Sequence, residues 1–108
     1  MPATLSKPTQ HDIEGFADVE AFATEHDLTD SLLIAYEIIC DVFPMAERIH
    51  VEHYTDPEDG HESLIIVFSA DLTLDQAVEL DLEWNRRVCR ALEPDALWRI
   101  GMLHEFME

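Results

Sequence analysis

Residues 62–92 read ESLIIVFSADLTLDQAVELDLEWNRRVCRAL, and they decide the architecture of this chain of 108 residues. Their first part, Leu64–Phe68, is apolar without alternation, which is typical of a central strand covered on both faces. Thr73 and Gln76 then have the spacing of a capping box, in which each side chain bonds the backbone N–H of the other residue. We therefore expect a central strand followed by an amphipathic helix that runs from Thr73 to about Leu92.

A further strand is predicted on each side of this unit. Arg48–Tyr54 alternates between apolar and polar residues, and the proline and glycine of residues 55–60 are turn residues, so the sequence predicts a hairpin. Downstream, Pro94 ends the helix and residues 97–106 alternate again, which predicts a third strand. Because a strand, a helix and a strand in one sheet form a right-handed crossover, the third strand should run parallel to the central one.

Two helices are predicted before the hairpin. The first covers residues 18–26 with Asp18 as its cap, and the second starts at Thr29 or Asp30. The second helix ends at Phe43, because the proline that follows disfavours helical backbone at the residue before it. The predicted element order is therefore α-α-β-β-α-β.

This order defines the fold class and the domain organisation that we expect. The fold is α+β, a two-layer domain with a small three-stranded mixed sheet and the helix from Thr73 on one face. The other face needs cover as well, either from the helix that ends at Phe43 or from a second copy of the sheet. Residues 16–108 form one domain, because a chain of this length buries a single modest core. Residues 1–15 are rich in turn residues and form a flexible leader.

The helix that ends at Phe43 is apolar around almost its whole circumference. Only Glu37 and Asp41 mark a polar seam along it. A helix of this kind is buried on several sides, and a single subunit of this size has little material to surround it. The sequence therefore predicts a homodimer that covers residues such as Leu33 and Ile34.

The chain is strongly acidic, with 24 Asp and Glu residues against 6 Lys and Arg residues and a net charge of −18. This charge disfavours direct binding to nucleic acid or to an acidic membrane, because both attract clustered cations. It suits a protein that is steered electrostatically towards a basic protein partner. The acidic residues that we expect at such an interface are Glu37, Asp41, Asp56, Glu58 and Asp59.

Two polar residues interrupt the apolar face of the helix that follows the central strand. Asp81 and Asn85 are four residues apart, so their side chains point the same way. A buried carboxylate needs a partner, and Arg48, Arg99 and His53 are the candidates. These considerations suggest a small ligand-binding site made of Asp81, Asn85, Arg99 and His53.

The remaining signals predict no metal site, no cofactor and no catalytic residue. His50 and His53 are three positions apart on a strand, so their side chains point to opposite faces. Cys40 and Cys89 lie in separate helical patterns without a Cys-x-x-Cys pair, and we expect both to be small buried hydrophobes. The chain also lacks a phosphate loop and a nucleophile elbow, which disfavours an enzyme.

We expect a cytoplasmic protein, because no secretory signal is readable and the longest apolar stretch is too short to span a bilayer. Our leading hypothesis is a non-enzymatic interaction protein, an antitoxin, inhibitor or adaptor, that binds a basic protein. One alternative is a small-ligand-binding or catalytic domain that uses Asp81 and Asn85. The other is a salt-adapted domain, since one lysine against five arginines is the composition that a salt-rich cytoplasm favours.

Overall fold

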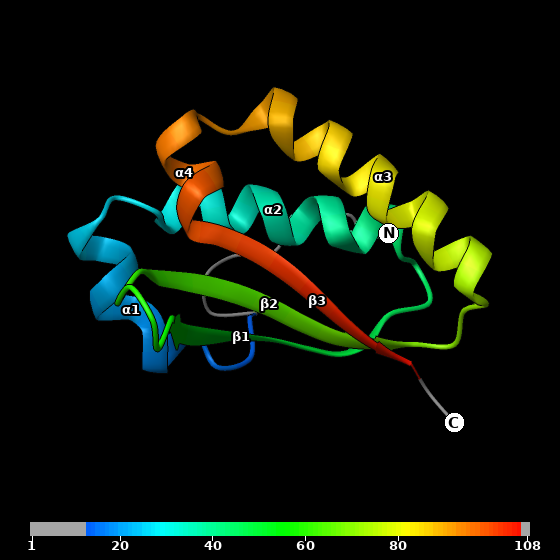
Figure 1. Ribbon diagram of the computed structural model, residues 1–108, viewed down its shortest axis with the longest axis horizontal. Coiled ribbons are helices and arrows are strands. Elements are labelled where there is room, and N and C mark those ends of the chain that lie inside the picture. The colour runs from blue at the N-terminus through cyan, green and yellow to red at the C-terminus, as the bar shows by residue number, and fades with distance from the viewer. Residues whose placement is uncertain (1–12, 107–108) are drawn as a thin grey trace, which may run out of the picture.

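A computed structural model describes residues 13–106 of the chain and shows a three-stranded sheet with helices packed against it (Figure 1). The elements, in chain order, are α1 (Phe16–Glu25), α2 (Thr29–Val42), β1 (Glu47–Thr55), β2 (Glu62–Ala70), α3 (Leu74–Ala91), α4 (Pro94–Arg99) and β3 (Ile100–Phe106). The α+β class and the predicted order of elements are confirmed, with the short helix α4 added between α3 and the last strand.

The sheet has the order β1-β2-β3, so the apolar strand β2 is central, as its sequence predicts. β1 pairs with β2 antiparallel, and β3 pairs with β2 parallel. The mixed sheet therefore combines the predicted hairpin with the predicted crossover through α3. Within the register, Leu64 stands beside Ile100 and Ile66 beside Val51, which brings apolar residues of all three strands to one face.

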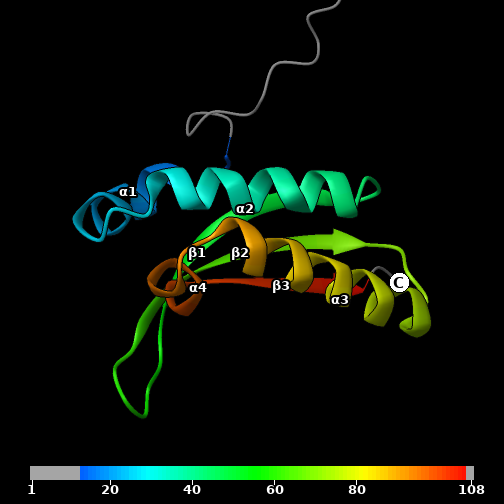
Figure 2. The same cartoon turned by 90° about the horizontal axis from the view of Figure 1, so that it is seen from above.

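The helices α2 and α3 contact each other and lie over the same side of the sheet (Figures 1 and 2). The alternating residues Leu64, Ile66 and Phe68 of β2 are fully buried beneath them. From α2, Leu32 and Ile39 enter the same core. Two covers were expected for the opposite face of the sheet, the helix that ends at Phe43 or a second copy of the sheet, and the first of these is therefore wrong. The buried residues of that helix form one stripe, and that stripe fits beside α3 on a single face.

The opposite face of the sheet is uneven in its exposure. The register places His50, Val67 and Leu103 in one row across it. Val67 is buried, whereas Leu103 is 56% exposed and Tyr54, further along the same face of β1, is 48% exposed. Within the described chain, the opposite face of the central strand is therefore covered at Val67, as predicted, whereas Leu103 and Tyr54 on the neighbouring strands stay open to solvent.

The N-cap of the first helix lies three residues earlier than predicted. It is Gly15, with a φ of 84°, and not Asp18. A side chain at position 15 would also collide with the carbonyl oxygen of Val51, which lies 2.7 Å from where a Cβ would be. The backbone N–H of Val51 donates to the carbonyl of Glu14, and Ile13 is buried. The last residues of the predicted leader thus pack against β1, and residues 1–12 lie outside the described residues.

The third strand begins at Ile100 and not at residue 97. Residues Pro94–Arg99 form α4, with proline in its first turn. Proline suits this position, because its fixed φ is helical and its missing N–H would have no partner there. Alternation over residues 97–99 was therefore a chance match to the strand pattern, and Trp98 is 69% exposed.

The capping box at the start of α3 is confirmed. The hydroxyl oxygen of Thr73 accepts a hydrogen bond from the backbone N–H of Gln76 at 3.2 Å. The side-chain oxygen of Gln76 accepts one from the backbone N–H of Thr73 at 3.0 Å. These reciprocal bonds satisfy two groups that a helix terminus otherwise leaves unpaired, so the sequence defines the start of α3 without tertiary help.

Candidate interaction surfaces

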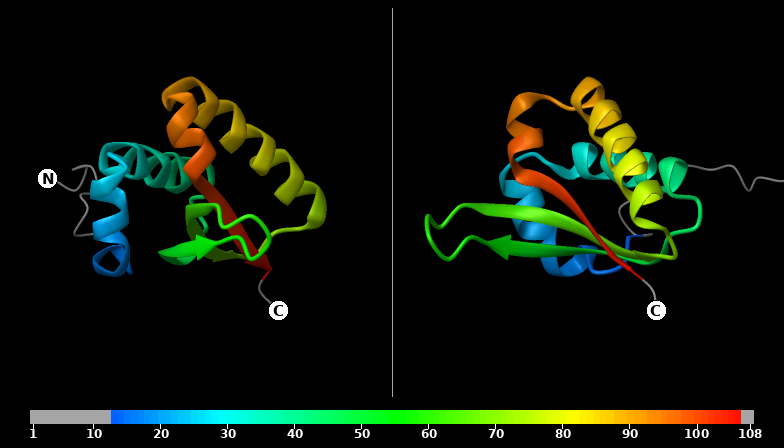
Figure 3. Two further views of the ribbon diagram at one scale, coloured as in Figure 1. Left: turned by 60° about the vertical axis from the view of Figure 1, so that its left-hand side comes forward. Right: turned by 45° about the vertical axis from the view of Figure 1, so that its right-hand side comes forward.

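The β1–β2 hairpin carries an acidic tip that projects from the body of the protein (Figures 2 and 3). We define the acidic tip as Asp56, Glu58 and Asp59. One carboxylate oxygen of Asp56 accepts hydrogen bonds from the backbone N–H groups of Glu58 at 2.7 Å and Asp59 at 3.4 Å. That of Asp59 accepts one from the backbone of His61 at 2.8 Å. The aspartates therefore shape the turn while they keep their negative charges at its end.

The charges of the acidic tip are not neutralised by the arginines of the described chain. None of its three carboxylates forms an ion pair with an arginine within residues 13–106. The arginine ion pairs in that range are made by Arg86 and Arg87 of α3, with Glu83 and Asp41 as their partners. The acidic tip is therefore a negatively charged surface at the end of a projecting hairpin.

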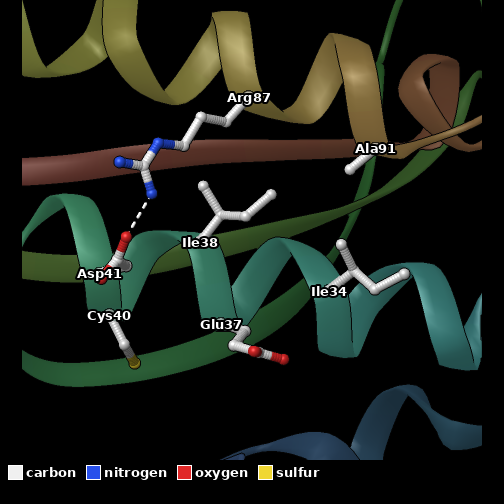
Figure 4. A pocket seen from close by; sticks show the side chains of 7 residues that line it. All are labelled: Ile34, Glu37, Ile38, Cys40, Asp41, Arg87 and Ala91. Carbon is white, nitrogen blue, oxygen red and sulfur yellow. Dashed lines mark hydrogen bonds and ion pairs between the residues drawn. The ribbon is translucent and has the colours of Figure 1, made fainter.

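A groove of about 660 Å³ lies between α2 and α3 and contains Glu37 and Asp41 (Figure 4). Asp41 forms an ion pair across the groove with Arg87, whose guanidinium also binds Glu83 at 2.9 Å. The hydrogen bonds from Asp41 and Glu83 raise the pKa of Arg87, and the bond from Arg87 lowers the pKa of Glu83. Asp41 therefore serves first to join the two helices, and Glu37 lines the groove beside it.

The two cysteines are more exposed than predicted. Cys40 lines the same groove, and Cys89 lies on the outer surface of α3. Partial burial raises the pKa of the Cys40 thiol, which keeps it in the protonated form at neutral pH. Their apolar neighbours in the sequence suggested burial, but both fall on helix sides that the sheet does not reach.

Asp81 lines a second, smaller groove of about 310 Å³ between α3 and the edge strand β3. Asn85 does not reach this groove; it is exposed and lines another groove, of about 630 Å³, beside Leu82 and Arg86 on α3. Asp81 and Nε2 of His104 are 3.3 Å apart. The side-chain amide of Asn85 donates to the backbone carbonyl of Asp81 at 2.8 Å. Asp81 thus has a partner, as expected for a carboxylate on this face, but the partner is a histidine of β3 and none of the three expected residues.

His53 and Arg99 gather at the other end of the sheet, around Phe22 and Glu62. Nε2 of His53 lies 3.1 Å from a carboxylate oxygen of Glu62. The guanidinium of Arg99 donates to the backbone carbonyl of Glu62 at 3.1 Å and lies 5.8 Å from the centre of the Phe22 ring. The four residues of the suggested ligand site therefore form two separate clusters.

Phe22 and Glu62, which complete this cluster, were not predicted from the sequence. Phe22 stacks on His53 with ring centres 4.5 Å apart, and Glu62 reaches His53 because the hairpin register pairs Thr55 with Glu62. The spacing of the turn residues could have suggested this register, but no local signal connects residue 22 with residue 53.

His50 and His53 point to opposite faces of β1, as predicted. Nε2 of His50 lies 2.6 Å from a carboxylate oxygen of Glu52, whereas His53 contacts Phe22 and Glu62. Among the side chains of residues 13–106, no group of three or more His, Cys, Asp or Glu residues could hold a metal ion. The two histidines therefore have separate roles, each with one carboxylate.

Comparison of the chain with protein-family models, with curated proteins and with solved structures found no match. In the part of the chain that is described, no helix has the length and apolar character needed to cross a membrane. The functional argument therefore rests on the surfaces described above.

Proposed function

We propose that this protein is a non-enzymatic, cytoplasmic interaction protein that binds a basic protein partner and restrains or recruits it, as an antitoxin, inhibitor or adaptor does. The observation that carries the proposal is the acidic tip, three carboxylates at the end of a projecting hairpin without an arginine partner in the described chain. A charged surface of one sign attracts an oppositely charged protein before contact, and this raises the rate of association.

The rest of the charge distribution supports this choice of surface. The net charge of −18 makes the whole chain attractive to a basic protein, but a general field does not select an orientation. Asp41 is already paired with Arg87, which leaves the acidic tip as the better candidate for the contact itself. Glu37, in the groove between α2 and α3, would form a second contact if the partner covers both surfaces.

We also propose that the protein acts as a homodimer, because large aliphatic side chains remain exposed on the helices and on β3. Burial of such side chains in a second copy would remove apolar surface from water. Self-association and binding of the basic partner are separate parts of the proposal, since they use different surfaces.

The experiment compares two triple variants that remove equal charge. In the first, Asp56→Asn, Glu58→Gln and Asp59→Asn neutralise the acidic tip while the amide oxygens can still accept the turn hydrogen bonds. In the control, Asp18→Asn, Glu20→Gln and Glu25→Gln neutralise three exposed acids of α1. Partners that the wild-type protein retains from a lysate of its source cells are purified, and their affinity for each variant is measured by calorimetry.

We expect a retained partner with a basic isoelectric point whose Kd rises about tenfold for the tip variant and stays near the wild-type value for the α1 control. The Kd should also rise with salt between about 50 and 300 mM, where screening becomes strong. Equal weakening by both variants would show that only the net charge matters. Retention of acidic or neutral proteins alone would contradict the proposal.

A second candidate function is a small-ligand site at the groove between α3 and β3. It is favoured by the Asp81–His104 contact and by a volume of about 310 Å³, at the lower end of the range for ligand pockets. This candidate expects Asp81→Asn to abolish binding of a small molecule while the fold is kept. Unchanged binding of any ligand found by screening would remove it.

The third reading, adaptation to a salt-rich cytoplasm, is tested by the melting temperature in KCl. Repulsion among surface acids is screened within the first few tenths molar, since the Debye length is already about 3 Å at 1 M. Our proposal therefore expects the melting temperature to level off below about 1 M KCl. A steep rise that continues through the molar range would favour salt adaptation.

A further inference from the structure

The outer side of α3 carries a row of exposed aliphatic side chains, which we call the α3 seam. It consists of Leu74, Val78 and Leu82, whose exposed fractions are 71%, 51% and 60%. Their spacing of four residues places them in one stripe along the helix. Next to the seam is β3, an edge strand paired only with β2 in the described sheet, and residues of β3 line one groove together with Leu74 and Val78. The seam and this edge together form a face that combines exposed apolar side chains with an unpaired strand edge.

The charges beside the α3 seam are ordered along the helix. Asp75 and Glu79 lie in its first half, and Arg86 and Arg90 lie in its second half; all four are exposed. At about 100° per residue they fall on the same flank of the seam. Two antiparallel helices related by a two-fold axis bring the same flanks together. Acidic and basic halves would then meet across such a pair.

The spacing of these charges defines a single position for the two-fold axis. Asp75 and Arg90 are equally far, in sequence, from the midpoint between Leu82 and Glu83. Glu79 and Arg86 are equally far from the same midpoint. An antiparallel copy centred there would place each acid opposite an arginine in both pairs at once. The α3 helix is therefore complementary in charge to a second copy of itself.

The position of the edge strand β3 is consistent with the same two-fold axis. Asp81, next to the midpoint on α3, lies 3.3 Å from His104, near the middle of β3. A two-fold axis at this point would bring the middle of β3 opposite the middle of the partner's β3, antiparallel to it. Antiparallel pairing of the two edges would satisfy the free backbone groups and extend the sheet.

We propose that a second copy of this chain docks on this face, with the two α3 helices antiparallel about an axis beside Leu82 and the two β3 edges facing each other. A second copy is favoured over a basic protein, because α3 carries three of the five arginines of the described chain. This face is favoured over other faces for self-association, because two chains that each carry a net charge of −18 repel each other wherever acidic residues meet. This inference rests on the self-association part of the proposed function and not on the basic partner.

The decisive experiment is an exchange of charges, measured by sedimentation equilibrium at low salt. Glu79→Arg and Arg86→Glu are made singly and together. Each single variant turns two attractive contacts of the dimer into repulsive ones, so we expect the dimer Kd to rise about tenfold or more. The double variant restores opposite charges across the axis, and its Kd should return to within about threefold of the wild type.

The single variant Glu79→Arg separates this interface from a general charge effect. It makes the chain less negative, which would strengthen any association limited by overall repulsion. Our interface predicts that it weakens the dimer instead. Glu20→Arg on α1 makes the same change in net charge at an exposed site outside the interface and is the matched control, for which we expect no weakening. Circular dichroism of each variant confirms that α3 is still folded.

A cross-link tests the position of the axis. With Cys40 and Cys89 replaced by serine, Leu82→Cys places a thiol beside its symmetry mate, and oxidation with copper phenanthroline in air should join the two copies through a disulfide. Ile34→Cys in the same background is the control and should stay monomeric on a denaturing gel.

The outcomes distinguish the two levels of the proposal. A wild-type protein that stays monomeric at about 100 μM would overturn self-association and this interface together. A wild-type dimer that resists both single charge reversals, that is not restored by the double variant, or that cross-links faster through position 34 than through position 82 would overturn this interface alone.

Discussion

The helices α2 and α3 differ in exposed apolar surface, and the difference is the reverse of what their sequences suggest. α2 is apolar almost all round, yet Leu32 and Ile39 are fully buried and Ile34 is only 37% exposed. α3 has a regular pattern of charges, yet it exposes Leu74, Val78 and Leu82 more than any large apolar residue of α2. The spare apolar surface of this protein therefore lies on the helix that looks better balanced in sequence.

The difference follows from the positions of the two helices in the layer. α2 lies between α1 and α3 and contacts both (Figure 3). α3 contacts α2 on one side, and α4 adds a few contacts near its end. A middle helix has neighbours on two sides and the sheet below, whereas an end helix leaves one side open. The amount of exposed apolar surface is thus set by the place in the layer more than by composition.

The largest expected effect concerns burial in the core. Leu32→Ala in α2 should lower the free energy of unfolding by about 3 kcal/mol. The leucine side chain is fully buried, so its removal leaves a cavity in the core. Leu82→Ala in α3 should change the stability of the monomer by less than about 0.5 kcal/mol. Urea unfolding at low protein concentration measures both. Equal losses for the two variants would show that the helices do not differ in this way.

The next largest effect concerns the dimer, for which α3 should be more sensitive to substitution than α2. Leu82→Glu should weaken the dimer about a hundredfold, because each copy would place a charge in the apolar contact. Ile34→Glu on α2 should leave the dimer constant near its wild-type value. Sedimentation equilibrium measures both constants. A stronger effect at position 34 would move the interface to α2, where the sequence pattern alone had suggested it.

The starts of the two helices should differ by a smaller amount. Thr73→Ala removes the hydroxyl that caps α3 and should cost about 1 kcal/mol. α2 has no side-chain cap, since its N-cap is Leu28, so Thr29→Ala should cost no more than a few tenths of a kcal/mol. Thermal unfolding of the two variants side by side provides the measurement, and a larger loss at Thr29 would contradict the assignment of the caps.

The smallest effect is a difference in pH response between α3 and β1. Glu83 has a lowered pKa because of Arg87, so its contribution to stability is present above its unfolded pKa and is lost as the pH falls through the folded one. His50 has a raised pKa because of Glu52, the backbone carbonyl of Arg48 and the charge of Glu14. Its contribution is present below its unfolded pKa and is lost as the pH rises through the folded one.

Two substitutions separate these responses. Glu83→Gln should flatten the dependence of the melting temperature on pH in the acid range, and His50→Gln should flatten it from about neutral pH upwards. Both groups are partly exposed to solvent, so both slopes should be shallow. A slope above neutral pH that survives in His50→Gln would show that another group causes it.

Features that depend on neighbours in sequence were predictable. The hairpin turn forms because Asp56 bonds the backbone two and three residues ahead, and α3 starts at the predicted capping box. The central place of β2 follows from its unbroken apolar run. In the candidate sites, the same local reasoning placed the acidic tip on a turn, whereas Asp81 and Asn85, one helical turn apart, line different grooves.

Features that depend on register and on the packing of distant segments were not predictable. Asp81 meets His104, 23 residues away, and Arg99 meets Glu62, 37 residues away. A one-residue change of register would turn these side chains to the other face of the sheet. The division of the suggested ligand site into two clusters is a consequence of that register.

The sequence by itself determined the order of the main helices and strands, the start of α3 and which strand is central, because caps, turns and apolar runs act over a few residues. The tertiary structure decided which helix stands at the end of the layer and therefore which apolar stripe stays exposed. That outcome depends on how many neighbours each helix has, and a pattern within one helix carries no information about its neighbours.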